Sequence, residues 1–439
     1  MKSIRPAYLR ALCLTVFCCS TPAAYSQRAF NLAIAGTNNG VVVSWPVQSA
    51  TPAGDLLILP QFQVQRSTDL HSWAAVSGNL SGSLHQTLTF TDTNSNLGFY
   101  RVQSIVDEEY AQLSGVVLNS GQLTGADFFG AELFGASLQN ASLSGAEFGG
   151  ADLRNANLQG SDLNGADFFG AFGLSATFDS STLVGADCRF ADFESGSLFN
   201  VDLTGVDFSS ATLDGVDFDF AFFKNVKMDA NTVIDPKPKR IWQIVNQGAT
   251  NALLTNLDFS FGDFTGASFN GANVSGCDFS AAILEQCDLR GANFTGAQMR
   301  FADFTSAQMD GTTIIDSKSR LVWQILNQNA GAGGDLHGKD LSSTFLVAAD
   351  LIGANLTNTL CTSIVCETAN FGAANMTHAN CGSGDFFGAI LTNANLTLVN
   401  FNSADLTDAN LFGATTNGAT FIGTTLSNTI MPDGSIRNF

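Results

Sequence analysis

Residues 113–147 read LSGVV LNSGQ LTGAD FFGAE LFGAS LQNAS LSGAE when they are written in groups of five. A large apolar residue opens each group, and a small residue, usually Ala, stands two places before the next large one. A helix does not accommodate this period, because five residues rotate it by about 140° and the apolar positions would wind around its whole surface. A straight strand does not accommodate it either, because consecutive small residues would fall on opposite faces.

The chain buries every small and large residue if it turns a corner after each small–large pair. Four corners close a square coil, which predicts a full turn of twenty residues. Residues twenty apart agree with this length, since Phe128, Phe148 and Phe168 align, Cys188 interrupts the column and Phe208 resumes it. The pattern therefore predicts a column of phenylalanine side chains inside the coil.

The triplets Ala126-Asp127-Phe128, Ala151-Asp152-Leu153 and Ala156-Asn157-Leu158 carry a resemblance to a known family. They resemble the A-(D/N)-L-x-x consensus of the pentapeptide-repeat proteins, and the resemblance covers roughly three quarters of the chain. It implies an all-β fold, the right-handed quadrilateral parallel β-helix, which is a solenoid whose coils bury their inner faces against one another. The best-understood members of the family are acidic rods that resemble duplex DNA and engage DNA gyrase.

Breaks in the period divide the repeats into three register blocks with two short helical insertions, preceded by a small β-sandwich. The expected order is a secretory signal peptide over 1–26, the β-sandwich over 27–106, block 1 over 107–234, an insertion over 235–251, block 2 over 252–315, a second insertion over 316–333, block 3 over 334–431, and a C-terminal turn and tail over 432–439.

The segment 1–26 has the composition of a secretory signal. Lys2, Arg5 and Arg10 precede and flank an apolar run over 11–19, and residues 24–26 form a small-x-small cleavage site. The apolar run is too short to span a bilayer. The sequence therefore predicts a secreted, periplasmic or cell-surface protein without a membrane span.

Residues 27–106 lack the five-residue period. Short β-rich runs at 41–45, 62–66, 88–91 and 99–102 alternate with turn-forming clusters and predict a small β-sandwich. These runs, together with Trp73, resemble the fibronectin-type-III-like modules of exported bacterial proteins.

The two insertions are copies of each other, and a constant shift in numbering aligns them so that Trp242 falls on Trp323. Apolar residues spaced by one, three and four predict a short helix in each. We expect each helix to lie against the coils, with its Trp covering apolar surface where the register slips; the alternative is a protruding element that binds a partner. The period places Val233 and Ile314, just before the insertions, at inward positions.

The composition is acidic, with 19 Lys and Arg against 39 Asp and Glu for a net charge of −20. This charge disfavours nucleic acid and anionic membranes as partners and favours basic proteins or cations. We find no GxSxG, HExxH or nucleotide-binding GxGxxG motif, and a P-loop-like run at 333–340 carries Asp340 where Ser or Thr is required. The sequence therefore predicts no catalytic site, no cofactor and no dedicated metal centre.

Acidic residues that precede a large inward position recur every twenty residues and predict an outward column of carboxylates about 5 Å apart. Its members are Asp127, Glu147, Asp167, Asp187 and Asp207. A basic protein, a polyamine or weakly bound Ca²⁺ would relieve their mutual repulsion; alternatively, the column is simply solvated. Phe129 and Phe169 are expected at the neighbouring corner, either exposed to a partner or a sugar, or folded onto adjacent coils.

The six cysteines beyond the signal segment all occupy inward repeat positions, which predicts small buried side chains. They are Cys188, Cys277, Cys287, Cys361, Cys366 and Cys381. Cys361 and Cys381 lie one coil apart, and that separation also allows a disulfide.

These observations favour an exported, non-enzymatic scaffold that mediates protein or cell-surface interactions. Two alternatives remain open. One is an acidic DNA-mimicking rod that acts on a DNA-binding protein such as gyrase, which requires a cytosolic location. The other is a carbohydrate-binding extracellular protein.

Overall fold

The computed structural model describes residues 113–438 and, before them, the backbone of eight strands between residues 16 and 104. The chain divides into two compact units, Met1–Lys239 and Arg240–Phe439. Each unit is described by itself below.

The strands of the N-terminal segment pair into two sheets. Their bounds are β1 (Val16–Phe17), β2 (Ala33–Thr37), β3 (Gly40–Pro46), β4 (Gln61–Ser67), β5 (Ala74–Ala75), β6 (Leu80–Ser81), β7 (Thr87–Asp92) and β8 (Phe99–Ser104). Strands β2, β3 and β7 form an antiparallel sheet; in the other, β4 pairs antiparallel with β8, β5 and β6, and β1 runs parallel to β8. The four runs expected as strands lie in β3, β4, β7 and β8. The packing of a sandwich and the cleavage site of a signal peptide lie outside the described residues.

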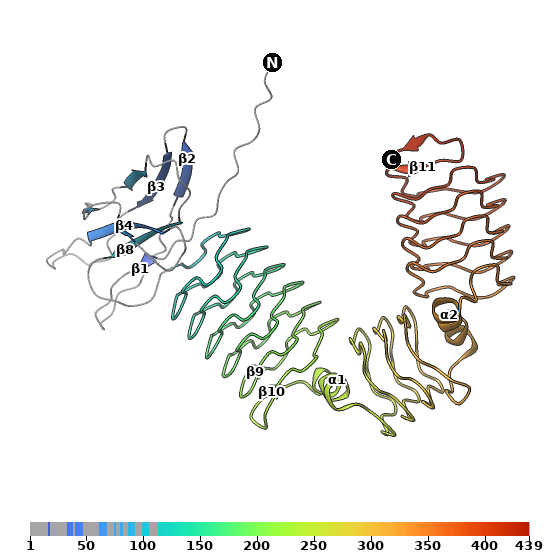
Figure 1. Ribbon diagram of the computed structural model, residues 1–439, viewed down its shortest axis with the longest axis horizontal. Helices are drawn as coiled ribbons and strands as arrows, with labels where there is room; N and C mark the ends of the chain where they lie inside the picture. The colour runs from blue at the N-terminus through green and yellow to red at the C-terminus, as the bar shows by residue number, and fades with distance from the viewer. Residues whose placement is uncertain are drawn as a thin grey trace, which may run out of the picture. The chain divides into compact units, whose positions relative to one another are not determined.

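The repeat region forms a parallel β-helix with twenty residues per coil, as the period predicts. Each side of a coil is joined to the next coil by backbone hydrogen bonds. The Phe128 N–H donates to the Glu147 carbonyl (2.7 Å), the Glu147 N–H to the Ala126 carbonyl (2.9 Å), and the Gly130 N–H to the Gly149 carbonyl (2.8 Å). Figure 1 shows the result as a ladder of squared loops in each unit.

The corners are tight turns with one residue in the left-handed region. In the corner after Phe128, the Ala131 N–H donates to the Phe128 carbonyl (2.9 Å) and Gly130 has φ 62°. A turn of this kind needs positive φ at its third residue, which Gly and Asn adopt most readily. The third place in each group is therefore often Gly, and Asn140 takes it with φ 55°.

The interior of block 1 is filled by the predicted column of phenylalanine rings. Phe128, Phe148 and Phe168 stack in parallel with centroid separations of 5.0 and 4.9 Å. Cys188 and Phe208 continue the column and are fully buried. The spacing of the rings equals the spacing of strands in a sheet, so each ring packs against the ring of the next coil.

The register slips by one residue before each insertion, not within it. Val233 of β10 (Val233–Ile234) pairs with Thr212 of β9 (Thr212–Leu213), one residue more than a full coil away, and its side chain is 49% exposed. Ile314 likewise bridges to Asn293 and is 54% exposed. The expectation that Val233 and Ile314 point inward was therefore wrong.

A hydrogen-bonded turn accommodates the extra residue. The carboxylate of Asp310 accepts the N–H groups of Thr312 (2.9 Å) and Thr313 (3.1 Å), and the buried Thr313 hydroxyl donates to the Leu289 carbonyl (2.9 Å). Asp229 and Thr232 form the same turn at the corresponding place at the end of block 1. Thr232 and Thr313 thus occupy the small inward position, and the next residue is forced outward.

The Asp310 turn predicts a dependence of stability on pH. The hydroxyl and N–H of Thr312 hydrogen-bond the carboxylate and lower the pKa of Asp310 to about 2. A carboxyl with a folded pKa below its unfolded value of about 3.9 stabilises the fold above that value, and this contribution is lost as the pH falls toward 2. We expect the urea concentration at the midpoint of unfolding to fall less steeply between pH 4 and pH 2 in the Asp310→Asn variant than in the unchanged protein. Parallel curves would contradict this.

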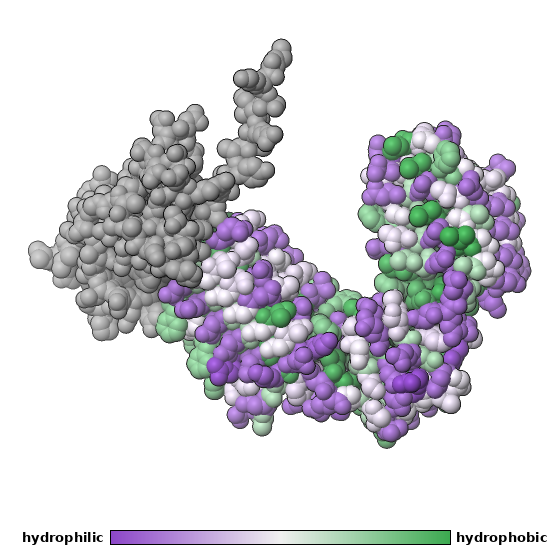
Figure 2. All heavy atoms as spheres, in the orientation of Figure 1, coloured by the Kyte–Doolittle hydropathy of each residue, from purple (hydrophilic) through white to green (hydrophobic). Residues whose placement is uncertain are grey.

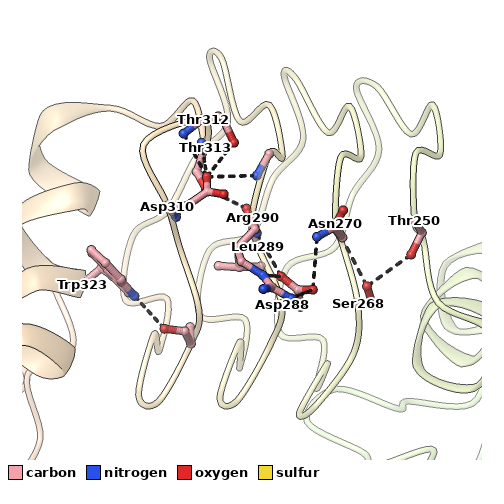
Figure 3. Close-up of polar contacts among 12 residues, drawn as sticks. Thr250, Ser268, Asn270, Asp288, Leu289, Arg290, Asp310, Thr312, Thr313 and Trp323 are labelled. Carbon is pink, nitrogen blue, oxygen red and sulfur yellow. Dashed lines mark hydrogen bonds and ion pairs between the residues drawn. The ribbon is translucent and has the colours of Figure 1, made fainter.

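Two helices follow the slips, α1 (Pro236–Gln247) and α2 (Ser317–Gln328). The Asp316 carboxylate caps α2 by accepting the N–H groups of Lys318 and Ser319 (2.9 and 3.0 Å). The buried Trp323 of α2 donates its indole N–H to the Ala307 carbonyl of block 2 (2.7 Å), as Figure 3 shows. Helix α2 therefore lies against the coils of block 2. In α1, Ile241 and Ile244 are buried.

The last coil ends in a short antiparallel pair, β11 (Thr429–Ile430) with β12 (Ile436–Arg437). Ile430 also bridges in parallel to Asn410 of the preceding coil. The chain thus folds back over one side of the final coil and covers part of an edge that otherwise presents unpaired backbone groups.

Candidate interaction surface

One side of block 1, called the acidic side, carries the predicted carboxylate column. Parallel bridges join its outward residues, which are Asp127, Glu147, Asp167, Asp187 and Asp207. The next residue in the column is Lys227, whose ammonium lies 3.7 Å from the Asp207 carboxylate. The column is therefore ordered by the coil and ends in a cation.

The carboxylates of this side accept hydrogen bonds from backbone N–H groups at the corners and are also part of the surface. Asp127 accepts the N–H of Phe129 (3.0 Å) and Asp167 accepts the N–H of Phe169 (2.8 Å). Asp187 binds the guanidinium of Arg189 through contacts of 2.8 and 2.6 Å, and this hydrogen bonding is the main cause that lowers the pKa of Asp187. The repulsion expected along the column is thus partly neutralised within the chain.

The neighbouring side, called the aromatic side, comprises the outward residues 132, 152, 172 and 192 with the corners on both flanks. Six of the nine exposed large apolar side chains between residues 113 and 230 lie on it: Phe129, Phe134, Phe169, Phe172, Leu174 and Phe190. On the face shown in Figure 2, apolar side chains are scattered among hydrophilic ones and do not form one continuous apolar patch.

Phe129 and Phe169 lie at the corner between the two sides. Phe129 is 64% exposed, and a Cβ atom at Gly149 would lie 3.0 Å from its ring. Phe169 is 45% exposed and packs edge-on against Phe190, with ring centroids 5.3 Å apart. Both rings therefore contact the neighbouring coil and still present a face to solvent.

Two arginines join the rings to the carboxylates. Arg189 lies over the ring of Phe169 (5.4 Å from its centroid) while it binds Asp187, and Arg154 lies over Phe134 (5.8 Å). Sequence reasoning missed these arginines. Each follows an acidic residue by two positions and a phenylalanine by twenty. With a coil of twenty residues, this spacing predicts that the arginine lies beside both the carboxylate and the ring.

In the second unit, polar side chains form a ladder across the coils of block 2 (Figure 3). The Asp288 carboxylate accepts from Arg290 (2.8 Å) and from the amide of Asn270 (3.2 Å). The hydrogen bond from Arg290 is the main cause that lowers the pKa of Asp288 to about 2. A carboxylate and an arginine two residues later therefore form the same pair in both units.

The described cysteines are structural. All six are buried free thiols; Cys277 and Cys287 donate to the carbonyls of Leu254 (2.7 Å) and Phe264 (3.0 Å). Burial raises the pKa of the Cys188 thiol well above its ordinary value.

Within residues 113–438, no group of three or more His, Cys, Asp or Glu side chains is arranged to hold a metal ion. The expectation of Ca²⁺ binding gains no support.

A hollow of about 200 Å³ lies in the second unit beside α2. Its lining includes Met299, Phe304, Asp316 and Lys318. Asp316 caps the helix, and Lys318 lies 3.3 Å from the Asp340 carboxylate. Asp316 and Lys318 thus have structural partners.

Comparisons with known proteins agree with the repeat. The family model for pentapeptide repeats matches in eight copies, over residues 131–170, 197–229, 250–286, 272–311, 385–415 and 404–437. No curated protein sequence matches the chain. Within the described part of the chain, no helix is long and apolar enough to cross a membrane.

Solved structures of pentapeptide-repeat proteins are similar to parts of the chain. HetL, involved in heterocyst differentiation regulation in the cyanobacterium Nostoc, is 20% identical over 74% of this chain and 94% of its own, with a TM-score of 0.22. A protein of the Arabidopsis thaliana thylakoid lumen is 27% identical over 25% and 74%, with a TM-score of 0.13. Full-length QnrB1, a plasmid-mediated fluoroquinolone resistance protein, is 16% identical over 70% and 92%, with a TM-score of 0.16.

These TM-scores are too low to support an argument about function. The family model and the twenty-residue coils agree on a repeat of five residues. Each of the three blocks of the solenoid contains pentapeptide repeats.

Proposed function

We propose that this protein is an exported, non-enzymatic scaffold that binds a protein or cell-surface partner through the acidic and aromatic sides of block 1. The observation that carries the proposal is the arrangement of exposed carboxylates and rings on two adjacent sides of a coil whose interior is filled. Backbone hydrogen bonds on every side fix the backbone that carries these groups, so binding does not have to order a loop.

The charge of block 1 favours a basic partner. Residues 113–234 contain four basic and 16 acidic residues, and 4 − 16 gives a net charge of −12. A surface of one sign speeds encounter with a partner of the opposite sign and disfavours partners of like charge. Exposed aromatic rings beside the charges supply the apolar contact that anchors an interface.

The test compares two matched triple variants. Asp127→Asn, Glu147→Gln and Asp167→Asn remove the unpaired charges of the acidic side and keep the acceptors that hold the corners. Asn157→Ala, Thr177→Ala and Ser197→Ala change the side of block 1 opposite the acidic side. A partner captured from envelope and medium is then titrated by biolayer interferometry at two salt concentrations.

We expect the acidic-side variant to bind roughly tenfold more weakly, chiefly through slower association, and the opposite-side variant to bind as the unchanged protein does. Equal affinities for both variants would exclude this surface.

A reporter fusion of residues 1–30 tests export. Retention in the cytoplasm would overturn export and favour the DNA-mimicking alternative, and capture of polysaccharide alone would favour the carbohydrate-binding one.

A further inference from the structure

The chain binds two of its own arginines in one type of site. In each, a carboxylate lies eighteen residues after an exposed phenylalanine, and the arginine lies two residues after the carboxylate. Arg154 contacts Asp152 (2.6 Å) and lies 5.8 Å from the centroid of Phe134. Because one coil is twenty residues, ring and arginine occupy the same corner of consecutive coils, with the carboxylate beside them.

The same site recurs in block 1 without its arginine. Glu147 lies eighteen residues after Phe129, and Gly149 stands where the arginine belongs. Glu147 is exposed, and Phe129 is the most exposed phenylalanine of residues 113–438. The carboxylate and the ring therefore occupy the same repeat positions as Asp187 and Phe169, which bind Arg189 in a later coil, but the chain supplies no guanidinium there.

A second copy lies in block 3. Asp405 follows Phe387 by eighteen residues, and Thr407 stands at the place of the arginine. Phe387 is 41% exposed, its N–H donates to Asp385 (3.0 Å), and Asp385 bridges to Asp405. Glu367 occupies the same corner one coil earlier; burial, and then the charge of Asp385, raise its pKa. Three carboxylates, from consecutive coils, thus lie at this corner or on the side next to it.

We propose that Phe129 with Glu147, and Phe387 with Asp405, are binding sites for guanidinium groups of an arginine-bearing segment of a partner protein. The inference rests on the proposed function and specifies the chemistry of its partner. Arginine is favoured over lysine because its planar guanidinium stacks on a ring and hydrogen-bonds a carboxylate through two N–H groups at once. Arg154 and Arg189 show both contacts in this chain.

The experiment measures binding of fluorescent hexa-arginine and hexa-lysine peptides to the full chain by anisotropy, at low and at physiological salt. We expect hexa-arginine to bind more tightly than hexa-lysine. The double variant Phe129→Ala with Phe387→Ala should reduce that preference by roughly two- to fivefold per site and leave hexa-lysine binding unchanged. Arg189→Ala should open a further site at Phe169 and strengthen hexa-arginine binding.

A filling variant gives the sharpest control. Gly149→Arg with Thr407→Arg places the missing arginines in both sites and should reduce the preference for hexa-arginine. Gly149 has no left-handed φ, and the Phe129 ring that would meet a Cβ atom there can turn aside at its exposed corner. Gln139→Arg with Thr362→Arg adds the same charge at corners that lack both the ring and the carboxylate, and should leave the preference intact.

Equal binding of the two peptides by the unchanged protein, or an equal effect of the filling and charge-matched variants, would overturn the guanidinium assignment. Circular dichroism melting of each variant verifies that the coils are intact. If the captured partner still depends on the acidic side while the peptides show no preference, the proposed function stands and only the partner's chemistry is wrong. If neither depends on these residues, both proposals fail.

Discussion

Replacing Phe148 with alanine is expected to destabilise the first unit by about 3–5 kcal/mol, because it removes a fully buried ring from the middle of a stack and leaves a cavity. Phe128 and Phe168 hold the ring on both sides at 5.0 and 4.9 Å. Backbone hydrogen bonds fix the spacing of the coils, so the neighbouring rings have little freedom to close the gap.

Hydrogen exchange followed by mass spectrometry measures this loss coil by coil, which suits a repeat array in which each coil contacts only its neighbours. Amides between residues 123 and 173 should lose the most protection, and those of block 3 should be unchanged. Phe129→Ala is the matched control, since its ring is mostly exposed and its loss is expected to cost under about 0.5 kcal/mol. Uniform loss of protection along the chain would contradict local packing as the cause.

Replacing Trp323 with alanine is expected to cost the second unit a comparable amount, about 3–5 kcal/mol. The indole is buried between α2 and block 2, and it also supplies a hydrogen bond to the Ala307 carbonyl. Trp323→Phe retains much of the apolar contact and removes the donor, so it should cost about 1–3 kcal/mol.

Urea unfolding of the three proteins, with exchange of the amides in α2 and in residues 297–309, separates the two contributions. Gln328→Ala, at an exposed position at the end of the same helix, is the control and should stay within about 0.5 kcal/mol of the unchanged protein. If Trp323→Ala were equally mild, α2 would not be held to the coils by its tryptophan. The alternative of a protruding, partner-binding helix would then gain weight.

Most of the coil could be predicted from the sequence because its corners recur at a constant interval of residues. A corner every five residues and a turn every twenty follow from Ala126, Phe128 and their successors alone, and the same count places Asp127 and Glu147 in one outward column. The structure confirms the coil length and these positions.

The register slip could not be predicted from the period. An extra residue in the turns at 229–232 and 310–313 places an apolar side chain, Val233 or Ile314, where the five-residue count expects one. Apolarity therefore gives no warning that the side chain points outward. The informative residues are Asp310 and Thr313, whose hydrogen bonds close the wider turn.

The charge pairs of the surface were missed for a different reason. Arg189 is near Asp187 in sequence, but its contact with Phe169 depends on which corners of consecutive coils coincide. A count of charges made the acidic column look more repulsive than it is. Only the arrangement in space shows that Arg189 and Lys227 already neutralise part of it.

The spacing between the two hydrogen-bonded turns has a consequence for how such chains evolve. The segment from Asp229 to the residue before Asp310 is 310 − 229 = 81 residues long and holds one hydrogen-bonded turn, helix α1 and the coils of block 2, so it forms a self-contained genetic cassette. Unequal recombination that adds or deletes one cassette leaves Met228 followed by an identical kind of turn. Selection can therefore lengthen or shorten the scaffold, and change how many copies of a surface it displays, without any new solution to the packing of its core.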